Sequence, residues 1–181
     1  MRMRKTTTEQ QESLSEDELY RQAVNKALFI LEHSDKSEAE LRRRLVMNSY
    51  PEAIVDRAME YVRDLHYIDD ERYASSYIRT HSGALSRREM SNKLLQKGIS
   101  REVIDAAFQT AGEEDPSVNH AETAAAVRTL STKLGTRRKL TPKERMSVYG
   151  HMLRKGFKRD DIIAAFEELE VVVDREEIPF E

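Results

Sequence analysis

The chain has 181 residues, a net charge of −3, 35% charged residues and no cysteine. Without cysteine, a disulfide framework and a thiolate metal site are both excluded. No apolar run is longer than five residues, far short of the ~20 that a membrane-spanning helix needs. The first residues lack the apolar core of a signal peptide. We therefore expect a cytoplasmic protein with no membrane contact, and the scarcity of glycine and proline favours helices.

Residues 1–14 are polar and without periodicity, which predicts a disordered tail. Residues 15–67 then carry apolar side chains at helical spacing in three successive stretches. The second stretch begins at Ser37 and the third at Pro51, residue types that favour helix starts. This pattern predicts a first three-helix repeat.

Residues 68–112 repeat that organisation. Asp69 is predicted to cap the first helix of this segment, and Ser86 the second. Gly98 is predicted to close the second helix as a left-handed C-cap, and a third helix is expected from Ser100 to about Ala111. The segment is interpreted as a second three-helix repeat.

Residues 112–116 (Gly-Glu-Glu-Asp-Pro) have the composition of a linker. The segment 113–170 then shows three more helical stretches, which we interpret as a third repeat. Residues 171–181 are predicted to be an acidic tail, in which the three valines 171–173 are too few to predict a strand. The expected fold class is all-α.

Two internal similarities support a tandem array. The sequence Ser/Thr-x-x-Glu, a capping box, begins at Ser37, Ser86 and Thr141. In addition, residues 98–108 (GISREVIDAAF) return as 156–166 (GFKRDDIIAAF). A period near 50 residues is typical of small units that bury their apolar faces against one another. Such an architecture favours an extended binding surface over a catalytic pocket.

The chain shows no pattern typical of an enzyme. Its five histidines have no paired ligand spacing, and no nucleotide-binding or metalloprotease motif occurs. We therefore expect no catalytic residue, no metal and no cofactor. The acidic run Asp69-Asp70-Glu71 could imitate a metal site, but acids at a helix start more often cap it and complement its dipole.

Basic residues are unevenly distributed. Residues 128–159 hold eleven Lys or Arg and one acid, a local charge of +10. The second helix of every predicted repeat is also basic, which would form a stripe suited to nucleic acid or an acidic protein surface. A merely solvated helix face is the alternative. The candidate partner-binding residues are Arg42, Arg43, Arg44, Arg87, Arg88, Lys93, Lys97, Arg137, Arg138, Lys139, Lys143, Arg145, Arg154 and Lys155.

The second and third predicted helices of each repeat resemble a helix-turn-helix pair, which can bind in the major groove of DNA. Yet the third helices begin with acids, as in Asp160-Asp161. Recognition helices approach DNA with their N-terminal residues, so operator-type recognition is not expected.

The sequence resembles the RecX family, bacterial regulators of the RecA recombinase, from about Ala23 to Leu169. The most specific part is the run 67–79 (YIDDERYASSYIR), accompanied by the motif at 37–45 and by LLQKGI at 94–99. The family-motif residues, expected to be structural, are Tyr67, Asp69, Asp70, Arg72, Tyr73, Ala74 and Gly98. Two positions depart from the family pattern, since Ser49 and His66 stand where glycine is usual.

The resemblance implies three tandem three-helix repeats in an elongated, curved array. It also implies a non-enzymatic monomer that binds in the groove of the RecA–DNA filament. Filament assembly, ATP hydrolysis, strand exchange and repressor cleavage would be limited, and any contact with single-stranded DNA would be weak or indirect. The alternative is a stand-alone nucleic-acid-binding protein that uses the basic segment 128–159.

Overall fold

The computed structural model describes residues 14–173. The disordered tail predicted for residues 1–14, except Leu14, and the part of the acidic tail beyond residue 173 therefore lie outside the described residues. Within residues 14–173 the chain forms nine helices and two short strands. They are α2 (Glu16–His33), α3 (Glu38–Val46), α4 (Glu52–Asp64), α5 (Asp70–His81), α6 (Arg87–Gln96), α7 (Arg101–Glu114), α8 (Ser117–Leu134), β1 (Lys139–Leu140), α9 (Pro142–Lys155), α10 (Arg159–Glu168) and β2 (Val172–Val173). The predicted all-α repeat fold is confirmed.

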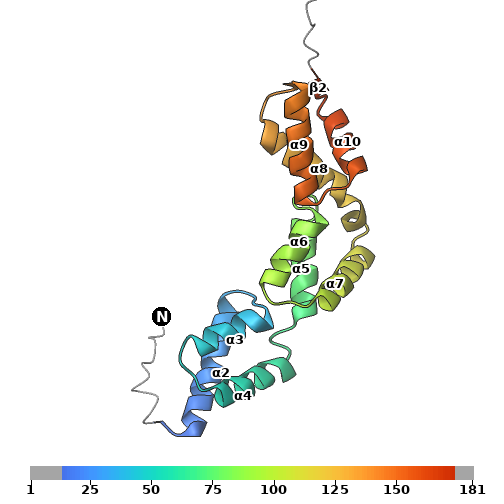
Figure 1. Ribbon diagram of the computed structural model, residues 1–181. Coiled ribbons are helices and arrows are strands. Elements are labelled where there is room, and N and C mark those ends of the chain that lie inside the picture. The colour runs from blue at the N-terminus through green and yellow to red at the C-terminus, as the bar shows by residue number, and fades with distance from the viewer. Residues whose placement is uncertain (1–13, 174–181) are drawn as a thin grey trace, which may run out of the picture. The chain divides into compact units, whose positions relative to one another are not determined.

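The chain divides into two compact units. Unit 1 comprises the chain up to residue 74 together with residues 94–104, and unit 2 comprises residues 75–93 and the chain from residue 105 onward. Helices α5, α6 and α7 each pass from one unit into the other. The middle repeat therefore contributes to both units, while α2–α4 belong to unit 1 and α8–α10 to unit 2 (Figure 1).

The core of unit 1 forms where α2 packs on α4, with α3 against both. Ala23 and Ala27 are fully buried on α2, and Ala58 on α4. These small side chains bring the helix backbones close together, and the larger Leu41 and Leu45 of α3 fill the remaining space. The core thus depends on a small-to-large complementarity across three helices.

Unit 2 repeats this arrangement with α8, α9 and α10. Leu130, Met152 and Ile162, one from each of these helices, are fully buried. The helices α2–α4 and the helices α8–α10 therefore each bury a core of their own. A separate ion pair in unit 2, between Arg79 and Glu114, joins α5 to α7.

The predicted hydroxyl caps form at all three capping boxes, but of these three the glutamate reaches back to the cap N–H only at Thr141. The hydroxyls of Ser37, Ser86 and Thr141 each accept a hydrogen bond from the N–H three residues on, at 3.2, 3.1 and 3.3 Å. The carboxylate of Asp69 accepts from the N–H of Arg72 at 2.9 Å, so Asp69 caps α5 as predicted. Gly98 has φ +86°, the left-handed conformation predicted for it.

Two local predictions were wrong. The valines judged too few for a strand supply β2, which pairs in parallel with β1. The N–H of Val172 donates to the carbonyl of Arg138 at 2.8 Å, a partner too distant in sequence for local reasoning to find. In addition, α7 continues through Gly112 to Glu114, so the first part of the predicted linker is helical.

Three of the helix ends within residues 14–173 lack the glycine that their backbone favours: Glu170 follows α10 with φ +51°, and the other two are the positions that depart from the family pattern. Ser49 follows α3 with φ +65°, and His66 follows α4 with φ +55°. The left-handed region costs a residue with a Cβ about 1–2 kcal/mol. Both side chains are exposed, so no buried contact offsets that cost.

Replacing His66 by glycine should therefore stabilise the protein by about 1 kcal/mol, because glycine adopts this conformation without strain. Urea unfolding would measure the change. The His66→Ala variant is the control, because it removes the imidazole and keeps the Cβ. An equal gain in both variants would show that the imidazole, rather than the backbone conformation, is unfavourable.

Candidate functional site

The serine cap at the start of α3 is also a joint between repeats. The hydroxyl of Ser37, which accepts from the α3 backbone, donates to the carbonyl of Lys97 at 2.6 Å. The ammonium of Lys97 in turn donates to both carboxylate oxygens of Glu40, at 3.1 and 3.2 Å. The residues that begin the second helix of repeat 1 therefore hold the end of the second helix of repeat 2.

The start of α6 is built in the same way within unit 2. Ser86 donates to the carbonyl of Lys155 at 2.6 Å, and the ammonium of Lys155 donates to Glu89 at 2.6 Å. Ser37 and Ser86 are both fully buried. The two joints thus use the same three residue types, with the serine three residues before the glutamate in both, and each unit holds one joint.

A carboxylate from the first helix of the following repeat completes each joint. Asp70 of α5 accepts from the N–H of Glu38 at 2.8 Å. Glu122 of α8 accepts from the N–H of Arg87 at 3.1 Å. Glu38 and Arg87 are the first residues of their helices, whose N–H groups have no partner inside the helix. The negative charge also lies at the favourable end of the helix dipole.

The glycine after each lysine lets the two backbones approach closely. A Cβ on Gly98 would collide with the Cβ of Ala39, and one on Gly156 with the Cβ of Arg88. Both glycines also have positive φ values, of +86° and +97°. Steric and conformational demands therefore both select glycine here.

Burial and pairing shift the pKa values of the joint residues in opposite directions. Burial alone would raise the pKa of Glu40, but the hydrogen bond and charge of Lys97 outweigh it and hold that pKa below its ordinary value. Burial dominates at Asp70 and Glu122 and raises the pKa of each carboxyl, despite the backbone hydrogen bond that each accepts. Lys97 has a raised pKa, because its hydrogen bonds to Tyr73 and Glu40 exceed the effect of its burial.

Most family-motif residues lie at or beside the first joint. Tyr73 places its ring 5.5 Å from the ammonium of Lys97, and Ala74 is fully buried. Arg72 donates to the carbonyl of His66 at 3.4 Å. Tyr67 is 53% exposed and stands apart from these contacts.

Half of the candidate basic residues are engaged within the chain. Arg42 binds Asp56 at 2.5 Å, and Arg137 binds Glu144 at 3.0 Å. The other engaged residues lie in the joints, on an aromatic ring or against backbone carbonyls; they are Arg87, Lys97, Arg138, Arg145 and Lys155.

The other seven are exposed and form no ion pair with any residue in the range 14–173. They are Arg43, Arg44, Arg88, Lys93, Lys139, Lys143 and Arg154. A cation without a partner keeps its charge available for an outside ligand. These seven, rather than the full set of fourteen, are the candidate contact surface.

The sequence reasoning missed the acidic half of the joints. Glu40 and Glu89 were assigned to local caps, and Glu122 was given no role. The signal was present in the sequence, because a Lys-Gly pair ends the second helix twice, at Lys97-Gly98 and at Lys155-Gly156. A glutamate at the third position of the second helix of one repeat pairs with a lysine at the end of the second helix of the next repeat, and this pair occurs twice.

The third capping box remains closed on itself. Glu144 accepts from the N–H of Thr141 at 2.9 Å and from Arg137 at 3.0 Å, and Pro142 is the first residue of α9. Across residues 14–173 no group of three His, Asp or Glu side chains is placed to hold a metal ion. No helix in that same range is both long and apolar enough to cross a bilayer.

Comparison with known proteins identifies the relatives of this chain. Residues 23–61 match the family model for the first three-helix domain of RecX, and residues 69–107 that for its second. A regulatory protein RecX of Clostridioides difficile is 28% identical over 85% of this chain and 71% of its own length. A regulatory protein RecX of Serratia proteamaculans is 28% identical over 77% of this chain and 92% of its own length. The chain spans about half (48%) of the matching protein of Clostridium beijerinckii, at 29% identity over 57% of this chain.

Two crystal structures share the fold. One, of a regulatory protein RecX, matches with a TM-score of 0.66 and 20% identity over 93% of this chain and 81% of the other. The second, RecX from Lactobacillus salivarius, has a TM-score of 0.65 and 19% identity over 86% and 99%.

Gly98→Ala should destabilise the protein by about 1–3 kcal/mol more than Gly83→Ala, because only the first adds a steric collision. Gly83 is the control: its φ is +73°, and a Cβ there would meet only the Cβ of Ala124, at an ordinary contact distance of 4.0 Å. Denaturant unfolding would measure both variants. Amide hydrogen exchange should also quicken at residues 37–40 in Gly98→Ala alone. Equal costs and unchanged exchange would refute the close approach at Ala39.

Two glutamine variants should respond to pH in opposite ways. The pKa of Glu40 is lowered on folding, so its stabilisation is present above the unfolded value of 4.5 and is lost as the pH falls through the folded pKa. The pKa of Glu122 is raised, so the wild type loses stability as the pH rises from 4.5 through the folded pKa. As the pH rises from about 3 to about 7, Glu40→Gln should therefore lose stability relative to the wild type, mainly below pH 4.5, and Glu122→Gln should gain it, above pH 4.5. Urea unfolding across this range measures both, and changes of the same sign would contradict the assigned burial and pairing.

Proposed function

The chain belongs to the RecX family, and we propose that it is a non-enzymatic regulator that binds the filament of RecA recombinase on DNA. In this proposal it acts in the cytoplasm as a monomer and limits filament assembly, ATP hydrolysis, strand exchange and repressor cleavage. The observation that carries it is the match to both RecX domain models, joined by relatives named as regulatory proteins.

The chemistry of the surface supports a binding role. Seven of the candidate cations are exposed and form no ion pair within residues 14–173, and each second helix, α3, α6 and α9, carries at least one of them. A nucleoprotein filament offers phosphates and acidic side chains, which such cations attract over several ångströms. Except for Arg88, whose side chain packs against Gly156, these cations lie outside the joints, so the contact surface can change without loss of the fold.

A stand-alone nucleic-acid-binding protein is the second candidate function. The concentration of eleven basic residues between residues 128 and 159 favours it. The two functions differ in stoichiometry. A filament regulator acts at substoichiometric amounts, whereas a competitor for DNA must cover the strand.

RecA-dependent ATP hydrolysis on single-stranded DNA should fall as this protein is added, well below the concentration that coats the DNA. Lys139→Glu combined with Lys143→Glu should weaken that inhibition and flatten its salt dependence, because both side chains are exposed cations without an ion pair in the described range. Arg21→Glu combined with Arg101→Glu carries the same charge change on exposed residues outside the candidate surface, and it should inhibit like the wild type.

Circular dichroism controls for folding in all three proteins. Inhibition only at coating concentrations would contradict filament binding and favour the second candidate. Equal inhibition and an equal salt slope in both double variants would show that Lys139 and Lys143 lie on a merely solvated face.

A further inference from the structure

A cleft of about 370 Å³ in unit 2 lies between the α5–α6 loop, α6, α8 and α9. We call it the α8–α9 cleft. Its polar lining comes from Glu89 of α6, from Arg128, Thr132 and Lys133 of α8, and from His151 and Lys155 of α9. Cationic groups from two helices thus converge on one opening, although they lie far apart in sequence.

Only part of this charge is neutralised within the cleft. Lys155 binds Glu89 at 2.6 Å, so this pair cancels. Arg128 and Lys133 are exposed and form no ion pair with any residue in the described part of the chain. The cleft therefore carries two uncompensated positive charges, which favour an anionic ligand.

The joint itself does not require these two cations. Helices α5 and α8 can be aligned on the carboxylate that each contributes to its joint, Asp70 and Glu122. The residues four positions later, Ala74 and Ala126, are both fully buried, which supports this alignment. In this register Ser76 corresponds to Arg128, and His81 to Lys133. The first joint is thus built without a permanent cation at either position.

His151 lies in the same cleft. Burial lowers its pKa first, and the charges of Lys133 on α8 and of Lys155 and Arg154 on α9 lower it further, with Glu89 of α6 acting in the opposite direction. Burial and the surrounding positive charge therefore both disfavour the imidazolium. An anion placed among these groups would reverse that effect and favour the imidazolium.

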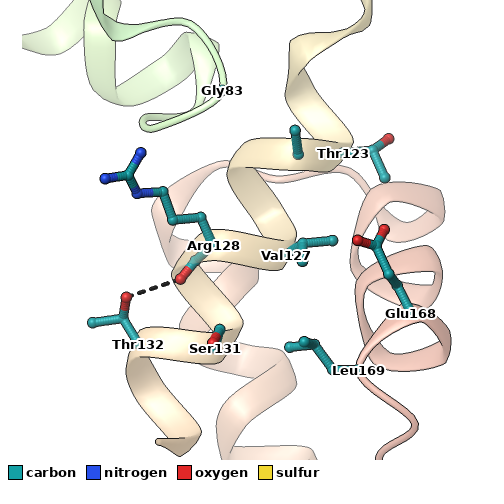
Figure 2. Close-up of a pocket in the computed structure, with 9 residues that line it drawn as sticks. Gly83, Thr123, Val127, Arg128, Ser131, Thr132, Glu168 and Leu169 are labelled. Atoms are coloured by element: carbon teal, nitrogen blue, oxygen red, sulfur yellow. Dashed lines mark hydrogen bonds between the residues drawn. The ribbon is translucent and has the colours of Figure 1, made fainter.

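Arg128 is directed toward the cleft-forming loop. Figure 2, which draws a neighbouring pocket between this loop, α8 and the end of α10, shows its guanidinium extending from α8 toward the loop at Gly83, away from Glu168 on α10. Ala84 and Leu85 of that loop line the α8–α9 cleft. The hydrogen bond drawn in Figure 2 joins Thr132 to the backbone carbonyl of Arg128 at 2.9 Å and does not involve the guanidinium.

We propose that the α8–α9 cleft binds a phosphate group, with Arg128 as a forked donor and Lys133 as a point charge. His151 takes up a proton when the phosphate arrives and becomes a third donor. The ligand class is a phosphate ester, either a free nucleotide or a phosphate of a nucleic-acid backbone. The proposal does not depend on filament binding, because a free phosphate ester can be tested without RecA.

The test titrates the full chain with ATP and, separately, with a 20-nucleotide oligothymidylate, and follows the imidazole signals of His151 by NMR. Arg128→Gln combined with Lys133→Gln removes both uncompensated charges. Lys158→Gln combined with Arg159→Gln is the control, because it removes two exposed cations of the same unit that do not line the cleft.

In the wild type and the control, one of the two ligands should shift the His151 signals and raise the pKa of His151. The cleft variant should bind that ligand at least about tenfold more weakly, because charged hydrogen bonds are lost. If ATP shifts the His151 signals at a lower concentration than the oligonucleotide does, the cleft is a nucleotide site. The reverse order identifies a site for the phosphates of a nucleic-acid backbone. The proposal is overturned if neither ligand moves the His151 signals, or if both variants bind like the wild type.

Discussion

The structure depends on one serine hydroxyl at each joint, which serves two helices at once. At Ser37 it accepts from the first turn of its own helix and donates to the carbonyl of Lys97, which ends the corresponding helix of the next repeat. Helix ends leave both kinds of group without partners. Because Ser37 and Ser86 are fully buried, water cannot replace either bond. A single small side chain therefore fixes where the next repeat must dock.

This joint decides which charges remain for function. Lys97 and Lys155 belong to the basic helices, yet each is bound to a glutamate of the preceding repeat. Their neighbours Lys93 and Arg154 lie on the same helices and are exposed without an ion pair in the described residues. Position along the helix, rather than residue type, separates the cations that hold the array together from those that a partner can reach.

The sequence allows prediction of what depends on neighbouring residues. The caps at Ser37 and Asp69 and the left-handed turn at Gly98 are local, and the structure contains all three. The roles of Glu40 and Glu122 could not be derived in this way, because their partners lie in another repeat and local capping explains a helix-start glutamate equally well. The pairing of β2 with β1 could not be predicted for the same reason, because the two strands lie far apart in sequence. Contacts between residues distant along the chain are what local sequence patterns fail to predict.

Pro142 changes what the last helix start can accept. At α3 and α6 the first N–H donates to a carboxylate of the following repeat, but proline has no N–H to offer. Glu144 is also occupied by Thr141 and Arg137. A second molecule presenting the same docking surface would find neither a donor nor an available carboxylate there. A single imino acid thus distinguishes the start of α9 from the two helix starts that hold a following repeat.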